Sequence, residues 1–218
     1  MKIRILTLII TLFLLSSCST ISHPGMAMDY VHQGIMYAGK GEYSLAMMEY
    51  DKAIESDPEC AQAYNDRGNI FFLKGEYDLA IKEYNLAIGI EPNYAKAFSN
   101  LGFVYFEKNQ YERAIIKFNK AIDINPDYAK AYNNRGLVYF AKGEYDRAIY
   151  DYNRAIDIEP DLAKPYDNRG AVFLIMGDSE RACSDFVKAC ELGECSTYDM
   201  VRSKGFCDMN YYAFAVIQ

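Results

Sequence analysis

The sequence is poor in the residues that most often carry out catalysis or bind metals. Only two histidines occur in its 218 residues, and neither His23 nor His32 lies in an HExxH segment. No Ser, Cys and acid arrangement converges on His32 from periodic positions, and no glycine-rich phosphate-binding loop is present. A CxxC pair, which zinc sites commonly use, is also missing. These absences disfavour an enzyme and predict that the chain uses no metal, cofactor or small-molecule substrate.

Positive charge is scarce as well. The chain contains 23 lysines and arginines against 30 aspartates and glutamates, a formal net charge of −7. The basic residues form neither a patch nor an arginine-rich run. Because nucleic acids and anionic lipid headgroups bind basic surfaces, the composition disfavours both as partners.

The one long apolar run lies at the N-terminus. Ile5 to Leu15 contains only apolar residues and threonine and follows the basic residues Lys2 and Arg4. It is shorter than the roughly 20 residues of a membrane span, but it has the anatomy of a secretory signal. The segment Leu15-Ser16-Ser17-Cys18 resembles a bacterial lipoprotein box. An ordinary secretory signal with a chance cysteine is the alternative.

The lipoprotein resemblance implies a removed signal peptide at 1–17 and a lipidated tether at 18–26. Cys18 would carry acyl chains such as palmitate and hold the protein to a membrane. Several acyl chains anchor a protein more firmly than one. Ser19 stands where an Asp would favour retention in the inner membrane. The resemblance therefore implies an outer-membrane location facing the periplasm.

The rest of the chain repeats with a period of 34 residues. The period is visible in one glycine series, two alanine series and one proline series: Gly34, Gly68, Gly102, Gly136 and Gly170; Ala46, Ala80, Ala114, Ala148 and Ala182; Ala53, Ala87, Ala121, Ala155 and Ala189; Pro58, Pro92, Pro126 and Pro160. A period of this length with two helical segments per unit indicates an α-solenoid. The order of aromatic, Gly, aromatic, Ala, Ala and Pro resembles the tetratricopeptide repeat family.

That resemblance implies an all-α, right-handed superhelix of five helical hairpins. The predicted units are 27–60, 61–94, 95–128, 129–162 and 163–196, and residues 197–218 would cap the array. In the fourth unit the helices are expected at about Ala129–Lys142 and Tyr145–Ile158, separated by Gly143. The residues after the prolines would cap the first helices of the next units: Asn93, Asp127 and Asp161.

In the tetratricopeptide family the first helices line a concave groove that holds protein or peptide partners. The sixth positions of the units are His32, Asp66, Asn100, Asn134 and Asn168. Neighbouring groove candidates are Asn65, Asn69, Asn133, Lys96, Lys130 and Lys164. A ladder of amides can donate to and accept from a peptide backbone without reading its sequence.

Two other interpretations of these residues remain open. The set from Asn65 and Asn69 through Asn100, Lys130 and Asn134 matches the family's carboxylate clamp only in part, because two positions lack the required charge. The asparagines could also be structural filler. Arg67, Arg135 and Arg169 are expected to pair with acids of adjacent helices.

Four cysteines gather near the C-terminus. Export favours disulfides, and an antiparallel cap would bring Cys195 to Cys190 and Cys207 to Cys183. We therefore prefer the pairs Cys190–Cys195 and Cys183–Cys207, although four cysteines allow three pairings. Cys60 is expected to be a buried free thiol.

The two resemblances together imply a membrane-anchored periplasmic scaffold that binds protein or peptide partners and helps to assemble an envelope complex. A holding factor for unfolded envelope proteins is the first alternative, and it would bind many clients weakly. An enzyme subunit is the second.

Overall fold

The computed structural model describes residues 24–207, which form eleven helices and no strand. The helices are α2 Pro24–Gly39, α3 Tyr43–Ser56, α4 Ala61–Leu73, α5 Tyr77–Ile90, α6 Ala95–Glu107, α7 Tyr111–Ile124, α8 Ala129–Ala141, α9 Tyr145–Ile158, α10 Ala163–Ile175, α11 Ser179–Glu191 and α12 Ser196–Ser203. The predicted signal peptide, the lipidation site Cys18 and residues 208–218 of the predicted cap lie outside the described residues. No helix between residues 24 and 207 is long and apolar enough to cross a membrane.

Ten of these helices form five hairpins, one in each 34-residue unit. The turn inside a hairpin depends on a residue with positive φ, such as Gly143 at 75°. At this turn the Gly143 N–H donates to Phe140 O, and the Glu144 N–H donates to Tyr139 O. This is the usual glycine-dependent end of a helix. In the third unit Asn109 takes the same position with φ 56°.

Within each hairpin a glycine of the first helix faces a large aromatic ring of the second. A Cβ atom added to Gly136 would lie 2.6 Å from Cε1 of Tyr152. Tyr152 is fully buried, as are Tyr84, Phe118 and Phe186 at the matching positions. The absence of a side chain on the glycine therefore lets the two helices approach until the ring fills the space between them.

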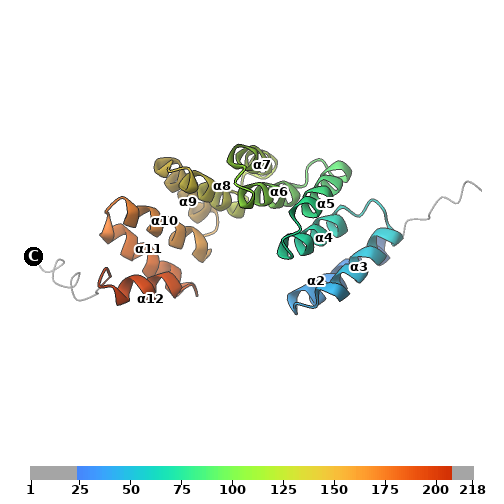
Figure 1. The fold of residues 1–218 in the computed structure, drawn as a ribbon, viewed down its shortest axis with the longest axis horizontal. Coiled ribbons are helices and arrows are strands. Elements are labelled where there is room, and N and C mark those ends of the chain that lie inside the picture. Colours follow the sequence, from blue (N-terminus) through green and yellow to red (C-terminus); the bar gives the residue numbers. More distant parts are fainter. Residues whose placement is uncertain (1–23, 208–218) are drawn as a thin grey trace, which may run out of the picture.

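The hairpins pack one after another into an arch (Figure 1). Each second helix contacts the first helix of the next unit, and consecutive first helices also contact one another. Consecutive second helices make no comparable contacts among the described residues. The first helices α4, α6, α8 and α10 therefore lie on the inner side of the arch. The predicted all-α solenoid is confirmed.

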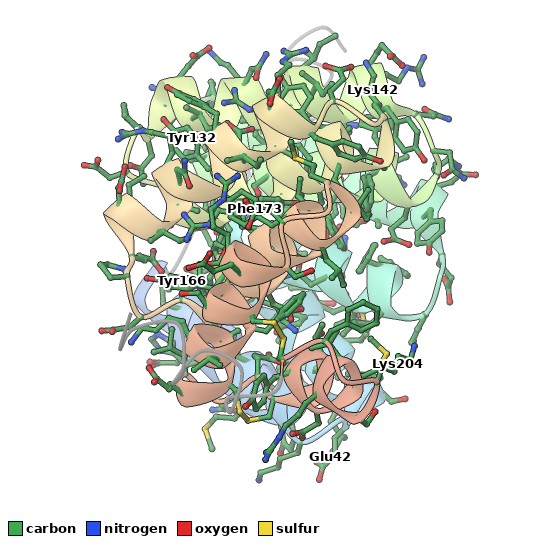
Figure 2. All side chains as sticks on the ribbon, turned by 90° about the vertical axis from the view of Figure 1, so that its left-hand side faces the viewer. Glu42, Tyr132, Lys142, Tyr166, Phe173 and Lys204 are labelled. Carbon is green, nitrogen blue, oxygen red and sulfur yellow. A yellow bond between two sulfur atoms is a disulfide. The ribbon has the colours of Figure 1, made fainter. Side chains whose placement is uncertain are left out.

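Viewed from the C-terminal end of the arch, apolar side chains fill the space between helices. Figure 2 shows Phe173 between helices and Lys142 at the rim. Phe173 is buried and belongs to a cluster with Ala182, Cys183 and Phe186. Val201 of α12 joins this cluster, so α12 closes part of the last repeat.

The predicted capping of first helices by Asn93, Asp127 and Asp161 is wrong. Helices α6, α8 and α10 begin after Tyr94, Tyr128 and Leu162, and no side chain caps them. The polar residue that stabilises this loop comes earlier, as the Asn125 side chain accepts a hydrogen bond from the Asp127 N–H at 3.1 Å. Side chains of Asx residues commonly bind the backbone two residues further on.

Two disulfides hold the C-terminal cap. Cys183 is bonded to Cys207 and Cys190 to Cys195, which are the two pairs that the sequence favours. Cys60 is a buried free thiol whose pKa is raised by burial. The Cys183–Cys207 bridge, which spans more of the sequence, joins the first half of α11 to the chain after α12.

The glycine–aromatic contact predicts a specific sensitivity to a single methyl group. Gly136→Ala should lower the free energy of unfolding by about 1–3 kcal/mol, because the buried Tyr152 ring has to move. Gly89→Ala is the matched control, since Gly89 is exposed in α5 and an added Cβ would meet nothing within 4 Å. The control should raise stability by up to about 1 kcal/mol through helix propensity. Thermal melting followed by circular dichroism tests both, and equal melting temperatures for the two variants would contradict the packing argument.

Candidate functional site

A small cavity lies on the inner side of the arch at the centre of the first helices. It has a volume of about 190 Å³ and is lined by Asn69, Phe72, Tyr84, Asn100, Phe103 and Asn134. Three of the predicted groove asparagines therefore meet at one place. The rings of Phe72 and Phe103, with centroids 5.5 Å apart, supply an apolar wall. The cavity thus combines amides with an aromatic surface.

The amides of this cavity are oriented by hydrogen bonds between neighbouring first helices. Asn100 Nδ2 donates to Asn65 Oδ1 at 2.9 Å and to Asn69 Oδ1 at 3.1 Å. The Tyr84 hydroxyl also donates to Asn69 Oδ1, at 2.8 Å. Because both amide hydrogens of Asn100 point at these oxygens, the group that Asn100 can offer to a ligand is its carbonyl oxygen.

The carboxylate of Asp66 accepts hydrogen bonds from the same network. Its Oδ1 accepts from Asn65 at 2.8 Å, from Asn69 at 3.2 Å and from Lys96 at 3.4 Å. The carboxylate is buried, and its Oδ2 has no hydrogen-bond partner among the described residues. A carboxylate only accepts hydrogen bonds. Asp66 therefore fixes which way the amides of Asn65 and Asn69 face.

A second amide bridge repeats the first one two units later. Asn168 Nδ2 donates to Asn133 Oδ1 at 2.9 Å, and Asn133 Nδ2 donates to Asn134 Oδ1 at 3.3 Å. The predicted ladder therefore exists, but it runs between helices. Asn65 and Asn133 are buried and do not line open surface, so we correct their assignment to the groove. They hold consecutive first helices together.

The three predicted groove lysines are exposed at the edge of the first helices. Lys96 pairs with Asp66, and Lys164 pairs with Glu194 at 3.0 Å. No ion pair of Lys130 is found among the described residues. The Lys164–Glu194 pair is exposed and contributes little to stability, whereas the acid that binds Lys96 is buried. A carboxylate clamp needs converging unpaired charges, so two of the three lysines are poorly suited to that role.

In three hairpins an arginine of the first helix forms an ion pair with a buried acid of the second helix and also binds a polar side chain of the preceding hairpin. Arg135 donates from Nε and Nη2 to Asp151 at 2.8 and 2.7 Å and from Nη1 to Asn119 at 2.6 Å. Arg67 binds Glu83 in the same way, and Arg169 binds Asp185. The predicted pairing of these arginines with acids is confirmed. Burial raises the pKa of the Asp151 carboxyl, and Arg135 partly offsets this effect.

The third unit replaces the arginine and the acid together. Leu101 stands in the position of Arg135, and Lys117 stands in the position of Asp151. In the first unit the acid is kept without the arginine: Gln33 stands in the position of Arg135, and the buried Glu49 pairs with Lys52 at 2.8 Å instead. Comparing residues 16 positions apart in each unit would have found the arginine–acid pairs of the second, fourth and fifth units from the sequence.

No cluster of three or more metal-ligating side chains occurs within residues 24–207. His32, the only histidine in the described part of the chain, is exposed on α2. The chemistry of the inner face is therefore that of amides, aromatic rings and exposed lysines.

Comparisons with known proteins identify the repeat. A family model described as "TPR repeat" matches residues 34–75, 68–108 and 104–143. A second model, described as "Tetratricopeptide repeat", matches residues 129–162. Together these matches span more than half of the chain. The search of curated proteins gave no significant match.

Several solved structures share the fold. MamA is 29% identical, with a TM-score of 0.60, over 76% of this chain and 96% of that chain. YrrB, described as a TPR protein with an unusual peptide-binding site, is 23% identical, with a TM-score of 0.58 over 82% of this chain and 92% of that chain. PilW, described as a widely conserved type IV pilus biogenesis factor, is 22% identical, with a TM-score of 0.70, over 77% of this chain and 78% of that chain.

The buried ion pairs predict a pH-dependent defect. Arg135→Leu leaves the Asp151 carboxylate buried without its main partner and should cost about 3–5 kcal/mol. Because burial raises the Asp151 pKa in the folded state, the cost is largest above that pKa and falls as acidification protonates the carboxyl.

Chemical denaturation of this variant at several pH values measures the effect. The double variant Arg135→Leu with Asp151→Lys copies the third unit and should recover most of the loss. A deficit that is equal at every pH, or that the second change does not relieve, would contradict the assignment.

Proposed function

Since the chain belongs to the tetratricopeptide repeat family, we propose that it is a scaffold that binds an extended segment of a partner protein on its inner face. The observation that carries this proposal is the cavity where Asn69, Asn100 and Asn134 meet Phe72 and Phe103. Members of this family generally act as scaffolds without enzymatic activity, and we propose the same for this chain.

The cavity suits a peptide in two respects. Asn100 presents a carbonyl oxygen that can accept from a backbone N–H, and the Asn134 side chain adds amide hydrogens that can donate to a backbone C=O. The two phenyl rings offer an apolar surface for one side chain of the bound segment. The volume of the cavity, about 190 Å³, is below the roughly 300–1,000 Å³ of typical small-molecule sites.

The first helices also carry lysines that bear on which part of a partner could bind. The exposed lysines Lys96, Lys130 and Lys164 stand in a row, one per unit, at the beginning of the first helices. Because Lys96 and Lys164 already form ion pairs, these lysines are poorly suited to bind the C-terminal carboxylate of a partner. We therefore propose that the groove holds an internal segment of its partner rather than its C-terminus.

We further propose that the scaffold is anchored through Cys18 at the periplasmic side of the outer membrane. The support is the signal-like N-terminus, the Leu15–Cys18 segment and Ser19. The first described helix begins at Pro24, so only a few residues would separate the lipid from the array. An anchored scaffold of this kind would work in the assembly of an envelope complex.

The groove is tested by site-specific photo-crosslinking in cells that produce the full chain. A photoreactive residue at Asn134 should capture one main partner. The same residue at Asn85, which is exposed on the second helix α5, should not capture it. A smear of many envelope proteins at position 134 would favour the holding factor instead, and capture at position 85 alone would move the partner surface off the groove.

The captured partner then allows a quantitative test. Asn134→Ala should weaken its binding by roughly fivefold to tenfold, the equivalent of about 1–1.5 kcal/mol for lost hydrogen bonds. Asn85→Ala is the matched control and should leave the affinity unchanged. Equal effects of the two substitutions, measured by titration calorimetry, would count against the amide groove.

The anchor is tested separately. The full chain should incorporate labelled palmitate and sediment with membranes, and Cys18→Ser should abolish both. Cys60→Ser serves as the control because Cys60 is buried in the first repeats. Unchanged membrane sedimentation of Cys18→Ser would show that lipid at this residue is not what holds the protein.

A further inference from the structure

Basic residues on the second helices usually have an acidic partner close by. Arg147, in the first turn of α9, pairs with Glu144 at 2.6 Å, and Arg181 of α11 pairs with Asp178 at 2.7 Å. Basic residues two turns further along their helices pair at 2.8, 3.7 and 3.2 Å: Lys52 with Glu49, Arg154 with Asp157 and Lys188 with Glu191. The positive charges of α3, α9 and α11 are therefore largely neutralised.

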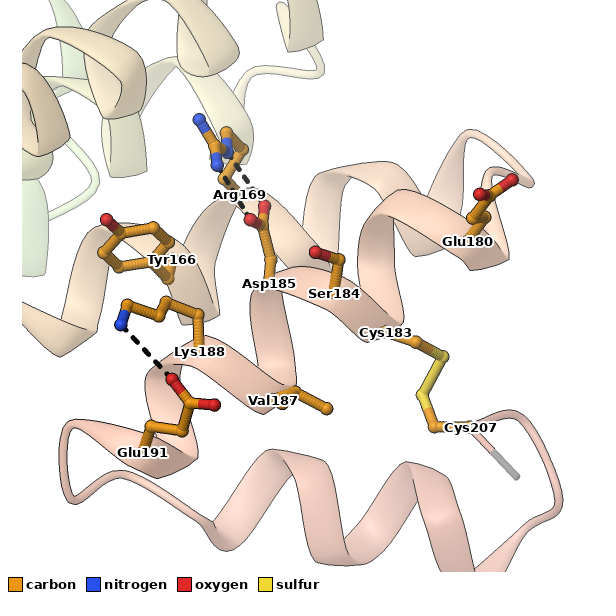
Figure 3. Close-up of a pocket in the computed structure, with 10 residues that line it drawn as sticks. All are labelled: Tyr166, Arg169, Glu180, Cys183, Ser184, Asp185, Val187, Lys188, Glu191 and Cys207. Carbon is orange, nitrogen blue, oxygen red and sulfur yellow. Dashed lines mark hydrogen bonds and ion pairs between the residues drawn. A yellow bond between two sulfur atoms is a disulfide. The ribbon is translucent and has the colours of Figure 1, made fainter. Parts of the chain in front are cut away.

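The third unit lacks two of the acids that the other units share. Gln110 precedes α7, and Lys117 lies inside it, whereas the other four units have an acid at both positions. In the fifth unit the second of these acids is Asp185, which Arg169 binds (Figure 3). The complete sets are Glu42, Glu76, Glu144 and Asp178 before the second helix and Glu49, Glu83, Asp151 and Asp185 within it. Two negative charges are thus missing around α7, and a positive charge replaces one of them.

Three basic residues of α7 consequently form no ion pair within residues 24–207. Arg113 donates only to the neutral side chain of Gln110, at 3.0 Å. The Lys117 ammonium lies 5.8 Å from the centre of the Phe98 ring, and Lys120 is exposed. No other second helix in the described part of the chain carries more than one unpaired cation. Unpaired positive charge is therefore concentrated on α7.

An apolar side chain lies in the middle of these charges. Arg113, Ile116, Lys117 and Lys120 follow the spacing of a single helical face, about 10 Å long. The Ile116 side chain is 62% exposed. Figure 1 shows α7 at the top of the arch, on its outer side. We call these four residues the α7 patch.

Negative charge borders the α7 patch. Glu112 is exposed and pairs with Lys142 at 3.1 Å. Asp123, one turn after Lys120, lines a cleft that it shares with Tyr150 of α9. The expectation that the basic residues form no patch is therefore wrong at α7. The sequence shows no basic run there, because the patch arises from missing acids rather than from additional bases.

The size of the α7 patch decides which anion fits it. Recognition of a membrane surface takes clusters of about four to eight basic residues, and nucleic acid needs a longer basic stripe. An extended anion over the three cations would also meet the bordering acids, in a chain whose net charge is −7. A short acidic segment of protein avoids this repulsion, since it can place carboxylates over Arg113 and Lys120 and an apolar side chain over Ile116.

We propose that the α7 patch docks a short acidic segment of a partner protein, with an apolar residue of that segment against Ile116. Charge complementarity speeds such an association and makes it depend on salt, and the apolar contact slows dissociation. The α7 patch lies on the outer side of the arch and the groove on the inner side. The scaffold can therefore hold one segment inside the arch and another outside it, and the proposal does not rest on the groove.

Site-specific photo-crosslinking locates the docked segment. In cells that produce the full chain, a photoreactive residue at Ile116 should capture a protein. Mass spectrometry of the adduct should place the crosslink in a segment with carboxylates on both sides of an apolar residue. The same photoreactive residue at Tyr150 is the matched control, because Tyr150 is 61% exposed at the corresponding position of α9. It should not capture this segment.

Two substitutions at residues that are not buried remove the charge of the α7 patch. Gln110→Glu gives Arg113 the acidic partner that Arg147 has in Glu144. Lys120→Glu reverses a second charge. Together they should lower the yield of the adduct roughly tenfold. Arg154→Glu, at the position of α9 that corresponds to Lys120, should leave the yield unchanged, and equal melting temperatures of the variants show that the fold is kept.

The captured segment then serves as a synthetic peptide probe for the purified full chain. Lys120→Glu should weaken its binding roughly fivefold to tenfold, and added salt should weaken the binding to the unsubstituted chain. A peptide with lysines in place of the flanking carboxylates should bind the Lys120→Glu variant more tightly than the unsubstituted chain. Vesicles of phosphatidylglycerol are the lipid probe, and Lys120→Glu should not change their binding.

Several results would overturn the proposal. These are the absence of an adduct at position 116, an adduct with a segment that has no carboxylates, and a yield that the charge substitutions do not change. Vesicle binding that Lys120→Glu weakens would assign the α7 patch to a lipid surface instead. Crosslinking at position 134 tests the groove separately, so either proposal can fail while the other stands.

Discussion

The close approach of a glycine backbone to an aromatic ring is the interaction on which the rest of this structure depends. Gly136 and Tyr152 show it in the fourth hairpin, where even one added carbon would overlap the buried ring. The contact sets how closely the two helices pack. Because it recurs in all five units, every hairpin has nearly the same shape, and identical hairpins can stack by a constant step. The arch is the geometric result of that repetition.

Stacking identical hairpins creates a second requirement, which polar side chains meet. Consecutive first helices lie side by side on the inner face, and the amides of Asn65 and Asn100 and of Asn133 and Asn168 bridge them. On the other side of α4, α8 and α10, arginines bind buried acids of their own hairpin and polar groups of the preceding one. Each of these bridges orients the asparagine side chains and leaves some of their donors and acceptors available to a partner. The open amides of the groove are therefore by-products of a network that holds the array together.

The two ends of a repeat array differ from its middle because one neighbour is missing. At the C-terminal end α12 covers only part of α11, and two disulfides fasten it there. The bridges supply cohesion that a shortened helix cannot supply through buried area alone. A cavity of about 680 Å³ beside them is lined by residues of α10 and α11 and by Cys207, but by no residue of α12. Packing between repeats therefore stabilises the middle of the array, whereas disulfides stabilise its C-terminal end.

Much of this protein follows from the spacing of residues in the sequence alone. The 34-residue period determines the hairpins, the glycine turns and the solenoid, because each depends on local contacts that repeat with the chain. The spacing of the four C-terminal cysteines was enough to favour the pairs that the structure contains. The capping of first helices was predicted wrongly, because Asn93, Asp127 and Asp161 each stand one residue before the N-cap residue of the next first helix.

Only the tertiary structure decided which asparagines are open to a partner. Asn65 and Asn69 lie one helical turn apart, and the sequence treats them alike. The rotation between successive hairpins buries Asn65 under the next first helix and leaves Asn69 at the cavity. That rotation depends on packing between units, which no single repeat contains. A periodic sequence can therefore determine its repeating unit, while the surface that the units form together is determined only when they stack.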